Sequence, residues 1–410
     1  MKILWVKSGG LIPADHGGRI RSYNLLKQLA RHHEVTFFTF YPEEPNDIHA
    51  ELDNVFHRVV RYTFKQPPAK GFQDAIAYGR NLLSLRPYSL TKYCRPGIRE
   101  RLAEVMRKER FDVVICDFLI SGGVIPWETD VPIVLFTHNV EAQIWERSYK
   151  LADNPIWKTV CWREYKTMAR LEERLVKDAD HVLAVSEDDK RGFLPYVSPE
   201  KISVIPTGVD PEYFQPVPGV PEKPNSLVFT GSMDWLPNDE GILYFVEQIL
   251  SLVQQRVPDV SLTVVGRKPS ERLKTLAAAN PAIRVTGRVE DVRPYMTEAS
   301  VYVVPLLIGS GTRLKVFEAM AMAKAMVSTP LGTEGLPVTH GENSMLADNP
   351  KDFADHVVSL LRNREERERI GKNARNFVEA NFSWEAVGKV LEQVLQKVTN
   401  ASAAVHTTAH

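Results

Sequence analysis

The chain has 410 residues, with 51 lysines and arginines balancing 51 aspartates and glutamates, and 44% of the residues are apolar. This length suggests two or three domains, and the ordinary apolar content excludes a largely disordered chain. The zero formal net charge gives no reason to expect nucleic acid as a partner. Three cysteines without a Cys-x-x-Cys pair exclude a disulfide framework and a cysteine zinc site, and they are typical of a reducing compartment.

The N-terminal segment predicts no signal peptide, because only the four apolar residues 3–6 precede Lys7 and a signal peptide needs about 7–15. The longest apolar run, residues 301–308, is interrupted by Pro305 and falls far below the roughly 20 residues that span a bilayer. We therefore expect a cytoplasmic protein, and contact with a membrane surface stays open.

The first half of the chain alternates between strand and helix patterns. Residues 3–6 predict a buried strand, and a glycine-containing loop and a helix from Arg19 follow it. The same patterns predict strands at 35–40, 113–116, 133–136 and 182–185, and helices at 96–107 and 162–176. Continuous apolar strands that alternate with helices favour a parallel sheet covered on both faces.

A segment with five prolines, residues 209–225, reads as an interdomain linker. Beyond it the alternation restarts, with strands expected at 227–230, 262–265, 283–286 and 301–305 and helices at 241–253 and 315–323. The expected fold class is α/β, with two facing doubly wound Rossmann-like domains and an interdomain cleft. We expect the domains at 1–212 and 213–383, a helix at 384–398 that packs back on the first domain, and a disordered tail at 399–410.

The densest chemical signal is the loop Gly309-Ser310-Gly311-Thr312, which follows a strand and opens a helix. Free backbone N–H groups and the positive end of the helix dipole favour a phosphate there. Arg313 and Lys315 would oppose that dipole unless an anionic ligand lay between them. Glu318, one turn later, suits the two hydroxyls of a ribose. The alternative interpretation is a solvated helix start with an incidental basic pair.

Continued to Leu336, this segment resembles the donor-nucleotide motif of family 4 of the retaining glycosyltransferases, which have the GT-B fold. Other matching stretches fall in the family's order: 16–18, 136–139, 184–186, 204–210, 229–233, 265–266 and 285–289. The resemblance covers about residues 1–395 and is specific to fold and superfamily, not to substrate.

The resemblance implies roles at the matching positions. Glu318 would hold the ribose, the Val289 region would line the base, and His138 would reach the transferred sugar near its anomeric carbon. With the two cations at the start of the helix, the predicted catalytic residues are His138, Arg313 and Lys315. The implied donor-binding residues are Gly17, Gly18, Gly231, Val289, Ser310, Gly311, Thr312 and Glu318.

The chain departs from the family in two places. The family commonly carries Glu-x7-Glu, but Ser310 stands eight residues before Glu318. The family also places an arginine and a lysine for phosphate soon after the first strand of the second half, and residues 231–238 contain neither. We expect Arg313 and Lys315 to take over that task.

Several other residues admit plain structural interpretations. Asp178 and Asp180 fit a metal-binding Asp-x-Asp pattern, but a helix-to-strand turn is the favoured interpretation. We predict no metal site and metal-independent catalysis. His16 and Asp117 are weaker candidates beside His138. The basic, aromatic stretch 157–177 could lie on a lipid surface, although a helix packed on the first domain is favoured.

The sequence thus predicts a hexosyltransferase-type enzyme of polysaccharide biosynthesis. It would transfer sugar with retention from a UDP- or GDP-sugar to a glycan or lipid-linked acceptor, with no cofactor. Two alternatives stay open: a sugar-nucleotide epimerase of the same fold, and a non-catalytic subunit that binds nucleotide sugars. The donor sugar, the base, the acceptor and the oligomeric state are not determined by these patterns.

Overall fold

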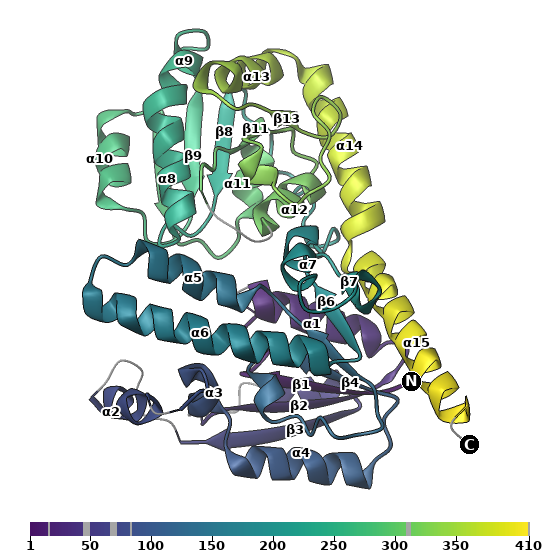
Figure 1. Ribbon diagram of the computed structural model, residues 1–410. Helices are drawn as coiled ribbons and strands as arrows, with labels where there is room; N and C mark the ends of the chain where they lie inside the picture. The colour runs from purple at the N-terminus through teal and green to yellow at the C-terminus, as the bar shows by residue number, and fades with distance from the viewer. Residues whose placement is uncertain (15–16, 44–49, 66–71, 83, 309–312, 409–410) are drawn as a thin grey trace. The chain divides into compact units, whose positions relative to one another are not determined.

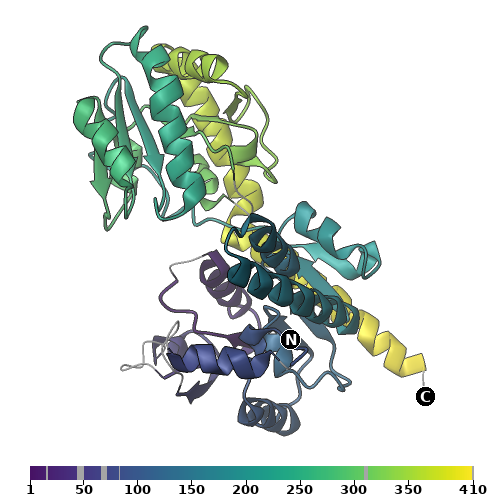
Figure 2. The same cartoon turned by 60° about the vertical axis from the view of Figure 1, so that its left-hand side comes forward.

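The computed structural model describes residues 1–14, 17–43, 50–65, 72–82, 84–308 and 313–408. The chain forms two compact units, whose elements can be followed in Figure 1 and, turned by 60°, in Figure 2. Unit 1 comprises Met1–Pro206 and Gly388–His410, and unit 2 comprises Thr207–Val387.

Unit 1 contains a parallel sheet of seven strands in the order β3-β2-β1-β4-β5-β6-β7. Its strands are β1 Lys2–Ser8, β2 Glu34–Pro42, β3 Arg58–Phe64, β4 Val113–Asp117, β5 Ile133–Phe136, β6 His181–Ala184 and β7 Ile202–Val204. Its helices are α1 Gly17–Leu29, α2 Phe72–Asn81, α3 Tyr88–Tyr93, α4 Pro96–Lys108, α5 Glu141–Leu151, α6 Pro155–Asp178 and α7 Glu187–Phe193, with the 3₁₀ turns η1 Ala50–Asn54, η2 Ser121–Gly123 and η3 Pro199–Lys201.

Unit 2 repeats the plan with six parallel strands in the order β10-β9-β8-β11-β12-β13. Its strands are β8 Ser226–Thr230, β9 Ser261–Val265, β10 Ile283–Gly287, β11 Val301–Val304, β12 Met326–Ser328 and β13 Met345–Leu346. Its helical segments are α8 Leu236–Tyr244, the π-helical turn η4 Phe245–Ile249, α9 Leu250–Gln254, α10 Glu271–Ala279, α11 Arg293–Glu298, α12 Leu314–Ala321, the 3₁₀ turn η5 Leu331–Thr333, α13 Pro350–Arg362 and α14 Arg364–Phe382.

Both sheets reverse their strand order beside the first strand of the unit, between β1 and β4 and between β8 and β11. This doubly wound topology confirms the α/β class that the alternating patterns predict. Strands β4 and β8 are buried along their whole length, as the continuous apolar runs suggest. Ligands of such sheets bind beyond the carboxyl ends of the strands at the reversal point, so that edge of each sheet is where a site is expected.

The unit boundary differs from the one expected at 212. Val209 N donates to Phe382 O at 2.8 Å and Trp384 N donates to Val209 O at 3.1 Å, which ties the chain after Pro206 to unit 2. The last helix, α15, spans Trp384–Thr408 and belongs to unit 1 from Gly388 onward. Residues 399–408 therefore continue this helix, where the sequence led us to expect a disordered tail. Among the residues described, none of the helices is both long and apolar enough to cross a membrane.

Candidate functional site

A buried polar group lies at the carboxyl edge of the unit 1 sheet, and we call it the Asp117 cluster: Trp5, Lys7, Arg21, Asp117 and His138. Asp117 ends β4, and the register of the parallel sheet places it beside Lys7 of β1 and Phe136 of β5. His138 follows β5 by two residues. Parallel pairing thus collects at one edge side chains that are far apart in sequence.

The Asp117 carboxylate is the centre of this cluster. Trp5 Nε1 donates to Oδ2 at 2.8 Å and Lys7 Nζ donates to Oδ1 at 3.0 Å. His138 Nε2 lies 2.7 Å from the same Oδ1. Asp117 is fully buried, and Lys7, Arg21 and His138 are nearly so. A buried carboxylate held by this many donors forms a fixed, satisfied centre.

The partners of His138 determine its protonation state. Arg21 Nη1 lies 2.9 Å from His138 Nδ1, and because a guanidinium only donates, Nδ1 must accept. The ring is therefore neutral, and Nε2–H donates to Asp117. Burial lowers the pKa of His138 to about 4, although Asp117 opposes the shift. Burial would raise the pKa of Asp117, but Lys7 and His138 outweigh it and hold that pKa well below its usual value.

A pocket of about 520 Å³ adjoins the Asp117 cluster and is lined by Lys7, Gly18, Phe118 and His138 among others. Phe118, directly after Asp117, has a φ of 78°, a left-handed conformation that a bulky residue rarely adopts. Strained residues of this kind gather at functional sites. A Cβ at Gly18 would lie 3.9 Å from His138 Nδ1 and one at Gly17 would meet no atom within 4 Å, so packing does not require glycine at either position.

Unit 2 carries a second group at the carboxyl edge of its sheet, which we call the Lys315 site: Gly231, Asn238, Arg313, Lys315 and Glu318. Lys315 Nζ donates to Asn238 Oδ1 at 2.7 Å and lies 4.1 Å from the centre of the Phe229 ring. A Cβ at Gly231 would stand 2.6 Å from this Nζ and 2.7 Å from Asn238 Nδ2. Glycine at 231 therefore lets the Lys315 amine reach the end of β8.

Burial shifts the pKa of both Lys315 and Glu318 in the direction in which each group loses its charge. Burial lowers the pKa of Lys315 to about 7, with Glu318 opposing, and burial raises the pKa of Glu318 to about 7, with Lys315 opposing. Burial also lowers the pKa of Arg313, which directly precedes α12. The Glu318 carboxylate accepts no hydrogen bond from any residue that the structure describes. Such groups would gain from a ligand that offers a phosphate to the cations and hydroxyls to the carboxylate.

The remaining predicted residues fall into three groups. Val289 lies two residues past β10 and packs against the core of unit 2. The predictions for Ser310, Gly311 and Thr312, and for His16, lie outside the described residues. Asp178 ends α6, and Asp180 Oδ2 accepts from Ile133 N at 2.7 Å, which is the helix-to-strand turn that the sequence favours. Within the described part of the chain, no group of three or more His, Cys, Asp or Glu residues is placed to hold a metal ion.

Helix α6 packs on unit 1, as the favoured interpretation of its sequence predicts. One face, including Met168, Leu171 and Leu175, packs into the core of unit 1. Trp157 and Trp162 near its start remain 52% and 48% exposed.

Sequence reasoning missed several residues of these two sites. Lys7 follows an apolar run directly, and this position could have indicated a buried charge. No sequence pattern marked Arg21 or Asn238 as a site residue. Arg267 Nε donates to Ser232 Oγ at 2.6 Å and Lys268 Nζ donates to Asp234 Oδ2 at 3.1 Å. Two cations that follow β9 thus contact the loop after β8. That loop, residues 231–238, contains no arginine or lysine of its own.

Two protein families match this chain, one over most of unit 1 and the other within unit 2. The family described as Glycosyltransferase Family 4 matches residues 16–213, and the family described as Glycosyl transferases group 1 matches residues 224–363. Each unit of the chain is therefore similar to one glycosyltransferase domain, and the two matches follow one another along the chain. Asp117, His138 and Arg21 lie in the first matched segment, and the Lys315 site lies in the second.

Relatives and solved structures agree with this family. An uncharacterized 44.6 kDa protein in the cps region of Klebsiella pneumoniae is 23% identical over 93% of this chain and 96% of its own length. The MMP alpha-(1->4)-mannosyltransferase of Mycolicibacterium hassiacum is 26% identical over 72% of this chain and 74% of its own.

The solved structures show the shared fold. Sucrose-phosphate synthase from Thermosynechococcus elongatus superposes with a TM-score of 0.68 at 20% identity, over 98% of this chain and 99% of its own. Anabaena HepE in complex with UDP gives 0.67 at 14% identity, over 97% and 100%.

Proposed function

We propose that this glycosyltransferase moves a hexose from a UDP- or GDP-sugar to a glycan or lipid-linked acceptor, with retention of anomeric configuration and without a metal ion. The Lys315 site is the observation that carries this proposal. A cation reaches the end of β8 through the space left by Gly231. The Glu318 carboxylate, which accepts no hydrogen bond from a described residue, lies one helical turn away.

The donor's nucleotide would bind unit 2. Lys315 and Arg313 would face the diphosphate and stabilise the charge that grows on it as the bond to the sugar breaks. Glu318 would accept hydrogen bonds from the ribose hydroxyls. Because these side chains supply positive charge directly, the proposed reaction requires no metal. HepE, which shares the fold, was solved with UDP, and several curated relatives are mannosyltransferases.

The state of His138 supports retention. Inverting transfer needs a base that removes the acceptor proton, but His138 Nδ1 accepts from Arg21 and Nε2 donates to Asp117. In a retaining step through an oxocarbenium-like state, the bond between C1 and the phosphate oxygen breaks, and the acceptor oxygen bonds to C1 on the same face. The acceptor proton passes to the departing phosphate, so no histidine base is required.

The test uses purified protein with UDP- and GDP-linked mannose, glucose and galactose, each with and without glycan or lipid-linked acceptors and with EDTA throughout. We expect transfer that EDTA does not abolish, and slow hydrolysis without acceptor that first releases the sugar anomer of the donor, seen by NMR. An epimerised nucleotide sugar formed without acceptor would overturn the proposal. So would tight nucleotide binding without transfer or hydrolysis, or release of the opposite anomer.

A further inference from the structure

The loop after β8, residues 231–238, borders the Lys315 site and contains no arginine or lysine. Strand β9 pairs with β8 in the sheet, so the residues that follow β9 leave the sheet at the same edge as this loop (Figure 1). Two of these residues are cations, Arg267 and Lys268, and both side chains contact the loop. The proposed donor site gives neither of them a role.

The backbone around Arg267 packs directly on the loop after β8. A Cβ at Gly266 would lie 1.7 Å from Gly231 O, so only glycine fits at position 266. Met233 N donates to Arg267 O at 3.0 Å. Lys268 has a φ of 52°, a left-handed conformation that a residue with a long side chain rarely adopts. The backbone of Arg267 is therefore held against the loop, and strained backbone of this kind gathers at functional sites.

A chain of hydrogen bonds joins the Arg267 guanidinium to the Lys315 amine. Arg267 Nε donates to Ser232 Oγ at 2.6 Å, and Asn238 Nδ2 donates to the backbone oxygen of the same serine at 2.9 Å. Asn238 Oδ1 in turn accepts from Lys315 Nζ at 2.7 Å. Only Ser232 and Asn238 stand between the two cations in this chain, so Arg267 and Lys315 belong to one group at the end of β8.

The Arg267 guanidinium is anchored at one edge and open at the other. Its Nε donates to Ser232 and lies 3.7 Å from Asp234 Oδ1. Its Nη1 and Nη2 groups form no hydrogen bond or ion pair with any residue that the structure describes, and the side chain is 58% exposed. The Asp234 carboxylate is also held by Lys268 Nζ, which donates to Oδ2 at 3.1 Å. The two Nη groups are therefore available to an anion from solution.

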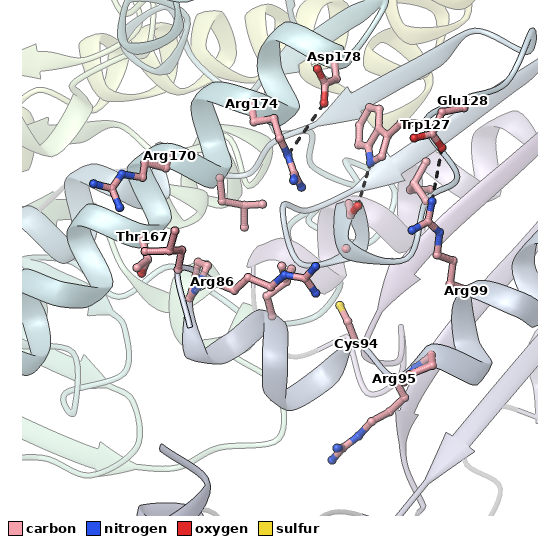
Figure 3. Close-up of a pocket in the computed structure, with 18 residues that line it drawn as sticks. Arg86, Cys94, Arg95, Arg99, Trp127, Glu128, Thr167, Arg170, Arg174 and Asp178 are labelled. Atoms are coloured by element: carbon pink, nitrogen blue, oxygen red, sulfur yellow. Dashed lines mark hydrogen bonds and ion pairs between the residues drawn. The ribbon is translucent and has the colours of Figure 1, made fainter. Parts of the chain in front are cut away.

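Two other exposed arginines show a different arrangement. At a pocket of unit 1, Arg99 Nη2 points toward Glu128 at 3.5 Å (Figure 3). In unit 2, Arg272 Nη2 lies 2.7 Å from Glu247 Oε1. Both side chains are about as exposed as that of Arg267, but each directs an Nη group at a carboxylate. Arg99 and Arg272 therefore serve as matched controls for Arg267.

We propose that Arg267 binds one phosphate of the donor's nucleoside diphosphate through its two Nη groups, while Lys315 faces the other phosphate. This inference rests on the proposed donor site and adds a residue to it. The planar fork of a guanidinium matches the paired oxygens of a phosphate. Ser232 is then a positioning residue, because it orients the guanidinium through Nε. Negative charge grows on the diphosphate as its bond to the sugar breaks, so a fixed guanidinium stabilises the departing group more than the intact donor.

The first experiment measures binding of UDP by titration calorimetry and binding of uridine by NMR titration, both with the full chain. Arg267→Ala should weaken UDP binding by about tenfold and leave uridine binding unchanged, because the guanidinium meets only phosphate. The controls Arg99→Ala and Arg272→Ala remove the same charge and should bind UDP as the wild type does. Equal losses for UDP and uridine, or a control that loses as much as Arg267→Ala, would overturn the proposal.

The same titrations separate this inference from the proposed function. If the wild type binds UDP or GDP and Arg267→Ala binds it equally well, Arg267 is removed from the donor site and the proposed function stands. If the wild type binds neither nucleotide, the proposed function fails and this inference fails with it.

A second measurement distinguishes a phosphate contact from simple fastening of the loop. Ser232→Ala removes the anchor of Nε but keeps the guanidinium, so it should weaken UDP binding by about threefold, less than Arg267→Ala does. Sodium chloride should weaken UDP binding by the wild type more steeply than by Arg267→Ala, because the variant lacks one charge that salt screens. Equal losses in Ser232→Ala and Arg267→Ala, with equal salt dependence, would show that Arg267 only fastens the loop and would overturn the proposal. Urea unfolding should match the wild type for Arg267→Ala, since the side chain is exposed.

Discussion

The Asp117 cluster of unit 1 and the Lys315 site of unit 2 both bury charged side chains at the carboxyl edge of a doubly wound sheet, and they balance those charges differently. In the Asp117 cluster every charge meets a partner from the same unit, so Asp117 stays ionised and His138 stays neutral. In the Lys315 site burial lowers the pKa of Lys315 and raises the pKa of Glu318, so that both are about 7. The charges of the Asp117 cluster are compensated without a ligand. A bound ligand would compensate those of the Lys315 site.

This contrast predicts that variants of the Asp117 cluster change stability, whereas variants of the Lys315 site change ligand affinity. Asp117→Asn should have the largest effect. An asparagine amide would face the Trp5 N–H donor with another donor and would leave the Lys7 charge buried without its partner. We expect a loss of about 3–5 kcal/mol in the free energy of unfolding, measured with urea.

The matched control for Asp117→Asn is Asp53→Asn, which removes an exposed partner of Arg61 and should cost less than about 1 kcal/mol. A loss no greater than that of the control would show that Asp117 is not the structural centre of unit 1.

The neutral His138 predicts a second stability effect. Its pKa in the folded protein is about 4, below the ordinary value of 6.5, so between these pH values the unfolded chain binds more protons. The contribution of His138 to stability should therefore rise by roughly 3 kcal/mol from pH 4 to pH 6.5 and stay constant above that.

The measurement compares urea unfolding of the wild type and His138→Gln across this pH range. His181, whose pKa burial also lowers to about 4, adds a slope of the same sign to both proteins, so the difference between them reports His138. Identical pH profiles would mean that His138 is not held neutral.

Among variants of the Lys315 site, Lys315→Met should weaken binding of the nucleoside diphosphate by about a hundredfold, because it removes the charge that faces the diphosphate. Titration calorimetry measures this affinity. The free energy of unfolding should stay within about 1 kcal/mol of the wild type, because the substitution removes a half-buried charge whose burial is itself costly.

Arg313→Ala provides the comparison for Lys315→Met, since both cations are expected to replace the pair that the family carries after β8. Near-normal affinity and turnover in both variants would end that hypothesis and shift attention to Arg267 and Lys268.

The smallest expected effect belongs to Glu318→Gln, which exchanges a charged acceptor for a neutral one and should cost about tenfold in affinity. The sharper measurement compares the nucleotide with its 2′,3′-dideoxy analogue. Wild type should prefer the ribose form, and Glu318→Gln should lose most of that preference. If both proteins discriminate equally, Glu318 does not contact the ribose.

The sequence by itself determined the fold class and the strands and helices with strong patterns. Nine apolar runs, including 113–116 and 301–305, are strands in the structure, because a buried parallel strand is a local, continuous apolar signal. Four strands were not predicted. Strands β7, β12 and β13 have three, three and two residues, too few to show a pattern. Strand β3 has seven residues, but only two of them are buried, so it lacks a continuous apolar run.

Only the tertiary structure decided which side chains meet. Asp117 and Lys7 are 110 residues apart and Lys315 and Asn238 are 77 apart, and strand order rather than local spacing brings each pair together. Periodicity reports which face of one element is buried, whereas a site forms where several elements end, and that position depends on the whole fold.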